Sequence, residues 1–461
     1  MGNYREEHDL LGFKNVPSEA YYGIQTVRAL ENFNISGEPI SNFPFLIKAL
    51  GYVKKATALA NREFNILSGD KTEAIVKACD EIIDGGFLDQ FPVDAIQGGA
   101  GTSVNMNANE VIANRALELF GKEKGDYLHI HPNNHINLSQ STNDVYPTAL
   151  RLAIVWKLER LKDSLKVLHV ALKEKSEEFK DVLKMGRTQL QDAVPMTLGH
   201  EFGAWALMVE DDLRELEEKI SILYTINMGA TAIGTGITAP KGYAKVVTKH
   251  LAKLTNLPLT LAPDLYRATQ DPSDFIEISS FLRKSALKVS KICNDLRLLS
   301  SGPRAGLGEI NLPPMQPGSS IMPGKVNPVI PEVVTQVAFE VAGNDLTIAM
   351  AGEAGQLELN VMEPIMAYKL FTSINHYTKV LQILRDRCIV GITANRERLR
   401  AMVENSIGLV TALVPVIGYE ACNAIAKKAQ ESGGSVYQIV LDEGHLSQEA
   451  LDKLLSIESM F

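Results

Sequence analysis

The chain has 461 residues, of which 45% are hydrophobic and 22% charged, as is ordinary for a globular protein. Its formal net charge of −9 argues against a general nucleic-acid-binding protein, and no apolar run approaches the ~20 residues of a membrane-spanning helix. Four widely separated cysteines show neither metal-ligand spacing nor a disulfide pattern, and the first residues lack the apolar core of a signal peptide. We therefore expect a cytoplasmic protein of two or three domains, with no nucleic-acid or membrane partner.

The first part of the chain is expected to become helical only after a long start. Roughly the first forty residues are predicted to form loops and short turns. From Phe45 onward, apolar residues recur at three-residue steps along one face, which predicts a helix, and a second helix is predicted over Asn107–Leu119. The polar segment Gly121–Gln140 follows. We take residues 1–140 as an N-terminal helical domain.

Long helices are predicted for the middle of the chain. Five are expected, over residues 148–184, 197–226, 272–299, 332–351 and 364–393. The first carries an apolar seam that is typical of helices packed in a bundle, formed by Leu158, Leu161, Leu165, Leu168 and Leu172. The fold class is therefore mainly α, with a central five-helix bundle domain over residues 141–394 and a small C-terminal helical domain over residues 395–461.

One loop between these helices has an unusual composition. Gly318–Pro328 reads GSSIMPGKVNP, with two glycines, adjacent hydroxyls and the charge of Lys325, which suits a carboxylate. It is not a phosphate-binding P-loop, because five residues separate its glycines and Val326 follows the lysine. A polar surface loop is the simpler alternative. Gly234–Ala239 matches a dinucleotide-binding fingerprint, but helices flank it instead of a strand, so no cofactor is expected.

The sequence GSSIMPGKVNP resembles the signature of the fumarase/aspartase superfamily, whose members eliminate across a carbon–carbon bond to release fumarate. Further segments resemble family motifs in the same order along the chain, over residues 97–107, 139–144, 186–193, 229–236, 301–306 and 358–364. The resemblance implies a mostly helical fold in three domains. It also implies a homotetramer with a twenty-helix bundle, in which three subunits build each active site.

The chemistry of such an elimination explains why these motifs carry hydroxyls and amides. A base removes a proton from the carbon next to a carboxylate, and that carboxylate becomes a dianionic aci-carboxylate that needs preorganised donors. The resemblance assigns its pocket to Thr102, Ser141, Thr142 and Ser320. It assigns the pocket for the other carboxylate to Thr188, Lys325 and Asn327, and it places Asn143 near the leaving group. Taken singly, each such residue is more commonly a helix cap or a turn residue.

Ser319 resembles the general base of the family. A serine hydroxyl is a poor base unless its alkoxide is stabilised. The loop amides around Ile321 and Met322, together with the charge of Lys325, are expected to supply that stabilisation. Closure of the loop over the substrate would exclude water and strengthen these interactions.

His131 and His135 have a spacing that invites a metal or acid–base interpretation. Because they straddle Pro132 and two asparagines, we expect no helix there and a structural or surface role for both. In fumarases the position of His131 holds a histidine of a second, non-catalytic anion site, and this role is left open. No metal is expected.

Gln189 separates the branches of the superfamily. Fumarases and several related lyases have histidine at this position and some aspartases have glutamine, whose amide can act as neither acid nor base. The sequences GAGTS around Thr102, STND at Ser141–Asp144 and NVMEP at Asn360–Pro364 also resemble aspartases more than fumarases. We therefore expect elimination of ammonia, with L-aspartate and fumarate as the small-molecule ligands. Fumarate hydration, or a non-catalytic protein on the same scaffold, are the alternatives.

Overall fold

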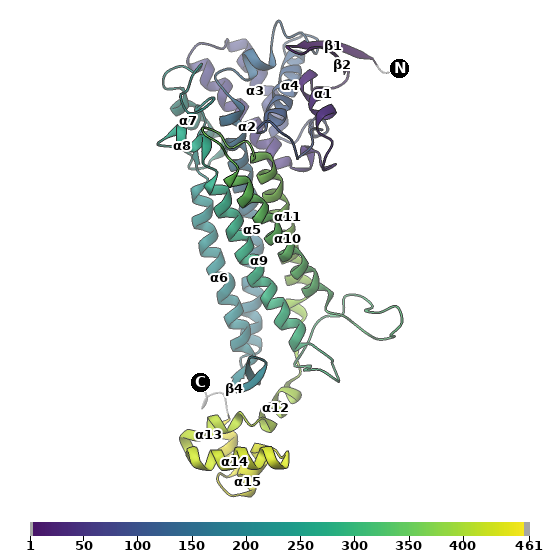
Figure 1. The fold of residues 1–461 in the computed structure, drawn as a ribbon, viewed down its shortest axis with the longest axis vertical. Coiled ribbons are helices and arrows are strands. Elements are labelled where there is room, and N and C mark those ends of the chain that lie inside the picture. Colours follow the sequence, from purple (N-terminus) through teal and green to yellow (C-terminus); the bar gives the residue numbers. More distant parts are fainter. Residues whose placement is uncertain (1–2, 456–461) are drawn as a thin grey trace. The chain divides into compact units, whose positions relative to one another are not determined.

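The computed structural model describes residues 3–455, and these residues are mainly helical (Figure 1). They divide into two compact units. One unit contains the residues up to 162 with residues 215–284 and 340–376, and the other contains residues 163–214, 285–339 and those from 377 onward. The divisions fall within the long central helices, so each unit holds a part of every long helix. The domain boundaries expected at residues 140 and 394 stay a prediction.

The chain begins with an antiparallel hairpin of β1 (Tyr4–Asp9) and β2 (Gly12–Pro17), followed by α1 (Ile24–Asn32). The prediction of loops for this region was wrong. The reason is that the inward-facing side chains of β1 are charged, whereas strand prediction looks for apolar alternation. Arg5 and Glu7 form an ion pair at 2.8 Å, and the buried Glu7 accepts the Ile24 N–H at 2.9 Å. Paired charges therefore take the place of an apolar strand face.

Three helices follow in the first unit: α2 (Pro44–Glu63), α3 (Gly69–Ile83) and α4 (Thr102–Leu119). The predicted helix from Phe45 is confirmed, with Ile47, Leu50 and Val53 fully buried along one face of α2. α2 packs against both α3 and α7 (Tyr243–Thr255). Shorter elements complete this unit: η1 (Ile40–Asn42), η2 (Leu88–Gln90), η3 (Pro132–Ile136), α8 (Leu265–Gln270) and the parallel strand pair β5 (Thr225–Ile226) and β6 (Thr260–Leu261).

The five long helices predicted from the sequence are present. They are α5 (Thr142–Glu178), α6 (Leu198–Ile222), α9 (Ser273–Leu299), α10 (Val329–Glu353) and α11 (Glu363–Arg387). All five leucines of the seam on α5 are at most 1% exposed, as a bundle helix requires. In the first unit, Arg151 of α5 pairs with Asp274 of α9 at 2.6 Å. In the second unit, Lys288 of α9 pairs with Asp212 of α6 at 2.6 Å.

The second unit also contains a hairpin and the C-terminal helices. The antiparallel strands β3 (Leu183–Thr188) and β4 (Gln191–Thr197) occupy a segment that was expected to be the end of a helix and a loop. α12 (Arg396–Asn405) packs on β3 and α13 (Leu409–Ile417) on β4. The predicted short helices after residue 395 are thus present. The remaining elements of this unit are α14 (Tyr419–Ser432), α15 (Val436–Asp442), α16 (Gln448–Leu454), η4 (Ile389–Gly391), and the pair β7 (Ile310–Asn311) and β8 (Thr393–Ala394).

Among the described residues, no single helix has the length and apolar composition needed to cross a membrane. Within residues 3–455, α12 and α13 reach that composition when taken together, and they are bent by 57° at the break between them.

Candidate active site

The hydroxyl of Thr102 stands at the first residue of α4. The turn before it places Gly101 at φ +90°, and a Cβ there would lie 2.5 Å from the ring of Tyr146. Glycine is therefore needed for both the backbone angle and the close approach. Thr102 itself is exposed, and its Oγ1 donates to Gly99 O over 2.7 Å. The first turn of α4 contains no acidic side chain, so its free amides and dipole favour an anion.

Ser141, Thr142 and Asn143 lie together where α5 begins. Ser141 caps this helix, because its Oγ accepts the Asn143 N–H at 3.2 Å. Thr142 is 8% exposed, and its Oγ1 accepts a hydrogen bond of 2.9 Å from Asn105 Nδ2. In both residues the described hydrogen bonds use a lone pair of the hydroxyl oxygen. Each hydroxyl proton therefore remains available to an anionic ligand.

The buried carboxylate of Asp144 fixes this turn against the segment 229–232. It accepts hydrogen bonds of 2.9–3.0 Å from the backbone amides of Ser141, Gly229 and Thr231. Burial raises the pKa of Asp144 to about 7, although these three donors act in the opposite direction. Asn143 Nδ2 donates to Ala232 O over 2.7 Å, which leaves its Oδ1 as the atom able to accept from an ammonium group.

Ser319 lies in the loop that leads from α9 to α10, which extends away from both helix ends (Figure 1). Its Oγ accepts hydrogen bonds from the amides of Ile321 at 3.2 Å and Met322 at 3.0 Å. These are the two amides that the sequence analysis placed near the hydroxyl. Two donors on one oxygen lower the energy of its alkoxide relative to the alcohol. Ser319, Met322 and Lys325 line a cavity of about 470 Å³ together with neighbouring loop residues.

The same loop closes on itself between Gly318 and Asn327. Gly318 N donates to Lys325 O over 2.7 Å, and Asn327 Nδ2 donates to Gly318 O over 2.6 Å. A Cβ on Gly318 would lie 2.7 Å from Lys325 O, so this closure requires glycine. These two hydrogen bonds hold Lys325 and Asn327 next to Gly318, the residue that precedes Ser319. The side chains of Ser320 and Lys325 are exposed in the single chain.

Thr188 and Gln189 occupy the tip of the β3–β4 hairpin. Gln189 and Leu190 form the two-residue turn with positive φ angles of 54° and 63°, a turn whose twist matches that of the strands. The side chains of Thr188, Gln189 and Leu190 are all exposed. The hairpin is anchored near its tip by an ion pair of 2.5 Å between Arg187 and the fully buried Glu309. Polar side chains on an anchored, exposed tip are well placed to meet a ligand or another chain.

The predicted site residues therefore fall into two sets, one in each compact unit. The first unit brings together the starts of α4 and α5, with Thr102, Ser141, Thr142 and Asn143. The second unit brings together the members of the loop, Ser319, Ser320, Lys325 and Asn327. It also holds the hairpin tip with Thr188 and Gln189, and no described hydrogen bond joins that tip to the loop.

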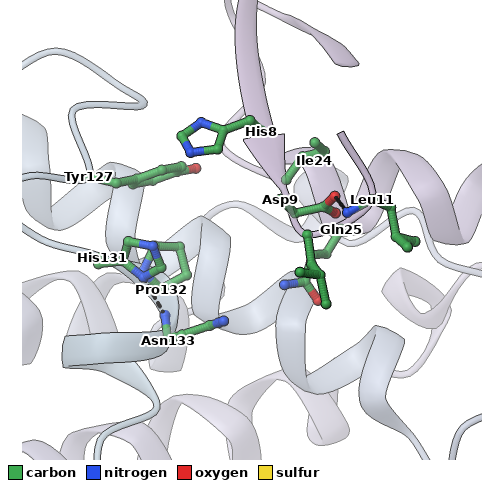
Figure 2. A pocket seen from close by; sticks show the side chains of 10 residues that line it. His8, Asp9, Leu11, Ile24, Gln25, Tyr127, His131, Pro132 and Asn133 are labelled. Carbon is green, nitrogen blue, oxygen red and sulfur yellow. Dashed lines mark hydrogen bonds between the residues drawn. The ribbon is translucent and has the colours of Figure 1, made fainter. Parts of the chain in front are cut away.

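A separate cavity of about 610 Å³ lies beside the N-terminal hairpin, where His8, Tyr127 and His131 border one side (Figure 2). His131 Nδ1 accepts the Asn133 N–H at 3.0 Å, and His135 Nδ1 accepts the His131 N–H at 2.8 Å. Both histidines thus hold the turn η3, a π-helical turn where no helix was expected. Burial lowers the pKa of His131. Among the described residues, no three His, Cys, Asp or Glu side chains are placed to hold a metal.

Comparison with known proteins decides the family. A family model described as lyase matches residues 12–343, and one described as the fumarase C C-terminus matches residues 409–461. The chain belongs to the fumarase/aspartase superfamily of lyases. The aspartate ammonia-lyase of Pseudomonas aeruginosa is 57% identical over 100% of this chain and 97% of its own length. That of Escherichia coli K12 is 50% identical over 99% and 96%.

Solved structures of the superfamily share the whole fold. The fumarate lyase:delta crystallin from Brucella melitensis bound to cobalt has a TM-score of 0.97 and 51% identity, with 100% of both chains covered. A class II fumarase from Schistosoma mansoni has a TM-score of 0.93 and 34% identity, with 99% of both chains covered. The expected superfamily fold is therefore confirmed.

Sequence reasoning missed the buried polar residues behind Thr142. Lys54 is fully buried on α2, and Asn105 is 1% exposed on α4. A signal was present, since Lys54 stands four residues after Leu50 and seven after Ile47 and therefore shares the apolar face of α2. A charged residue on such a face is rarely buried without partners.

Proposed function

We propose that this superfamily member catalyses the reversible elimination of ammonia from L-aspartate to give fumarate, and that it acts in the cytoplasm. The observation that carries the chemistry is the pair of backbone amides on Ser319 Oγ, beside Lys325 in the signature loop. The curated relatives that span almost the whole chain are aspartate ammonia-lyases, which supports the choice of substrate. Four free, buried cysteines fit a reducing compartment.

The reaction begins when the Ser319 alkoxide takes the proton from the carbon next to one carboxylate of aspartate. The electron pair of the broken C–H bond moves onto that carboxylate, which becomes the dianionic aci-carboxylate. The hydroxyls of Ser141, Thr142 and Ser320 donate to it, and the Thr102 hydroxyl does so once it turns away from Gly99 O. The free amides at the start of α4 add to its stabilisation. These donors are worth most once the closed site excludes water.

The second half of the reaction expels the amine. Thr188, Lys325 and Asn327 hold the other carboxylate, and the electron pair returns to form the double bond of fumarate as the C–N bond breaks. Asn143 Oδ1 and Gln189 accept from the ammonium group before it leaves as ammonia. Neither amide can deliver a proton, which a departing hydroxide would need. This difference favours ammonia elimination over fumarate hydration.

We further propose that the active enzyme is a homotetramer in which three subunits contribute to each site. Residues Phe339, Leu346 and Met350 of α10 are 63–65% exposed, and their spacing of seven and four places them on one helix face. An exposed apolar stripe of this length suits burial against another bundle. The exposed hairpin tip with Thr188 and the exposed Lys325 are explained in the same way, because a neighbouring chain would cover them.

Adding L-aspartate to the purified protein and following absorbance at the fumarate band tests the proposed function. We expect fumarate to accumulate with an equal amount of ammonia. A catalytically silent protein would favour the non-catalytic scaffold alternative, and fumarate formation from L-malate alone would favour a fumarase.

A further inference from the structure

A fully buried lysine lies behind the pocket proposed for the dianionic carboxylate, and the reaction described above gives it no role. Lys54 Nζ, on α2, donates to Gln140 Oε1 at 2.8 Å and to Asn137 Oδ1 at 3.1 Å. The side chain is 0% exposed. Its partners are neutral amides, and no ion pair of Lys54 is found among the described residues. Burying a lysine with only such partners is costly, so a functional reason is to be expected.

A chain of hydrogen bonds connects this lysine with the hydroxyl of Thr142. Asn137 Oδ1, which accepts from Lys54, also accepts from Asn105 Nδ2 at 3.2 Å. The same Asn105 Nδ2 donates to Thr142 Oγ1 at 2.9 Å. Three elements thus meet through polar side chains: α2, α4 and the start of α5. All of these residues belong to the first compact unit.

Lys54 sets the direction of this chain, because its Nζ donates both hydrogen bonds and even the neutral amine carries the two N–H groups that they use. Gln140 Nε2 is already engaged with the carbonyls of Ile136 and Leu138, so Gln140 must present its oxygen to Lys54. Asn137 must likewise present Oδ1, which also accepts a hydrogen bond of 3.1 Å from Asn109 Nδ2. A reversed Asn105 amide would then place its own oxygen against Asn137 Oδ1 at about the same separation, which is repulsive. Asn105 therefore offers its NH₂ group to both neighbours.

The orientation of Asn105 decides whether the proton of the Thr142 hydroxyl points toward the ligand. Since Thr142 Oγ1 accepts from Asn105, its own proton is left for the bound carboxylate. If Asn105 were reversed, the Thr142 proton would point to the amide oxygen, and a lone pair would face the ligand instead. A donor stabilises a dianion and a lone pair repels it, so the direction of this chain matters most in the intermediate.

We propose that Lys54 is a positioning residue of the elimination reaction, which orients Asn137 and Asn105 so that the Thr142 hydroxyl donates to the carboxylate that becomes dianionic. This inference rests on the proposed function, because it needs a dianionic intermediate in this pocket. Lys54 does not touch the substrate. Burial lowers the pKa of Lys54. The Asp144 carboxylate opposes this shift, because it favours the charged form of the lysine.

The test compares a ligand that resembles the ground state of the substrate with one that resembles the intermediate. Succinate carries an ordinary carboxylate, whereas 3-nitro-2-aminopropionate in its nitronate form carries two negative oxygens where the aci-carboxylate does. Inhibition constants for both would be measured on the parent and on Lys54→Met. We expect the variant to bind the nitronate at least about tenfold more weakly and to bind succinate within about threefold of the parent. kcat should fall together with nitronate affinity.

Lys157→Met is the matched control, since Lys157 is also buried and donates to an amide oxygen, that of Asn375 at 2.6 Å. It should leave the ratio of the two inhibition constants unchanged. Equal weakening of both ligands by Lys54→Met would show that the lysine only supports the fold of the pocket, and would overturn the proposal. A parent protein that binds neither ligand would contradict the proposed function itself, and this inference with it.

Two further variants keep the test decisive if Lys54→Met does not fold. Lys54→Gln fills the space with an amide that can turn either way, so it should show the same selective loss. Asn105→Leu removes the donor to Thr142 and should do likewise. In the Lys54→Gln/Asn105→Leu double variant, the losses should not add, because both act on one proton. Additive losses of nitronate affinity would contradict the proposed chain of hydrogen bonds.

Discussion

A serine becomes a base only where its alkoxide is stabilised, and Ser319 is the residue on which the proposed chemistry depends. Its two amide donors and the nearby Lys325 provide such a setting. We expect Ser319→Ala to lower kcat by more than the ~100- to 1000-fold that follows the loss of one oxyanion donor. Circular dichroism should show an intact fold. Activity within about tenfold of the parent would remove Ser319 from this role.

Lys54 gives a prediction for stability at the same scale. Burial lowers its pKa from 10.5 to about 7, so between these values the unfolded chain binds a proton that the folded chain does not. The parent should therefore gain stability as pH rises through this window, by up to about 1.4 kcal/mol per pH unit. The free energy of unfolding of Lys54→Met should not show this rise with pH. Unfolding free energies of both proteins at pH 7, 8 and 9 check this, and parallel curves would contradict it.

At the scale of elements, the turn before α4 is the most constrained part of the site. Gly101→Ala forces a left-handed alanine, which costs about 1–2 kcal/mol, and adds a Cβ against Tyr146, which costs a further ~1–3 kcal/mol. It should also displace Thr102 and raise KM. Gly121→Ala is the control, because Gly121 has φ +74° but open space around it. Melting temperatures that fall equally in both variants would show that the contact with Tyr146 is unimportant.

The elements also show what the sequence could and could not reveal. The long helices and the buried leucine seam of α5 were predictable, because apolar periodicity reports directly on burial. The β1–β2 hairpin was not, since the paired charges of Arg5 and Glu7 face inward. The polar chain from Lys54 to Thr142 was missed for a related reason. Hydrogen bonds between residues far apart in sequence leave no periodic pattern.

At the scale of the whole molecule, the proposed homotetramer has active sites that no single chain completes. If Ser319 and Thr188 of one site come from different subunits, mixing Ser319→Ala chains with Thr188→Ala chains should restore activity. Random assembly would leave about a quarter of the sites with both residues intact. The two variants must be unfolded and refolded together, with each refolded alone as the control. A fully active monomer in light scattering would refute the shared site.

The most direct test of the central claim compares L-aspartate with L-malate on the unmodified protein. Asn143 and Gln189 accept from an ammonium group but cannot protonate a departing hydroxide. The measurement is kcat/KM for both compounds in one mildly alkaline buffer, where Ser319 is more readily deprotonated. We predict that aspartate is converted to fumarate and ammonia while malate reacts poorly or not at all. Malate turnover equal to or faster than that of aspartate would contradict the account.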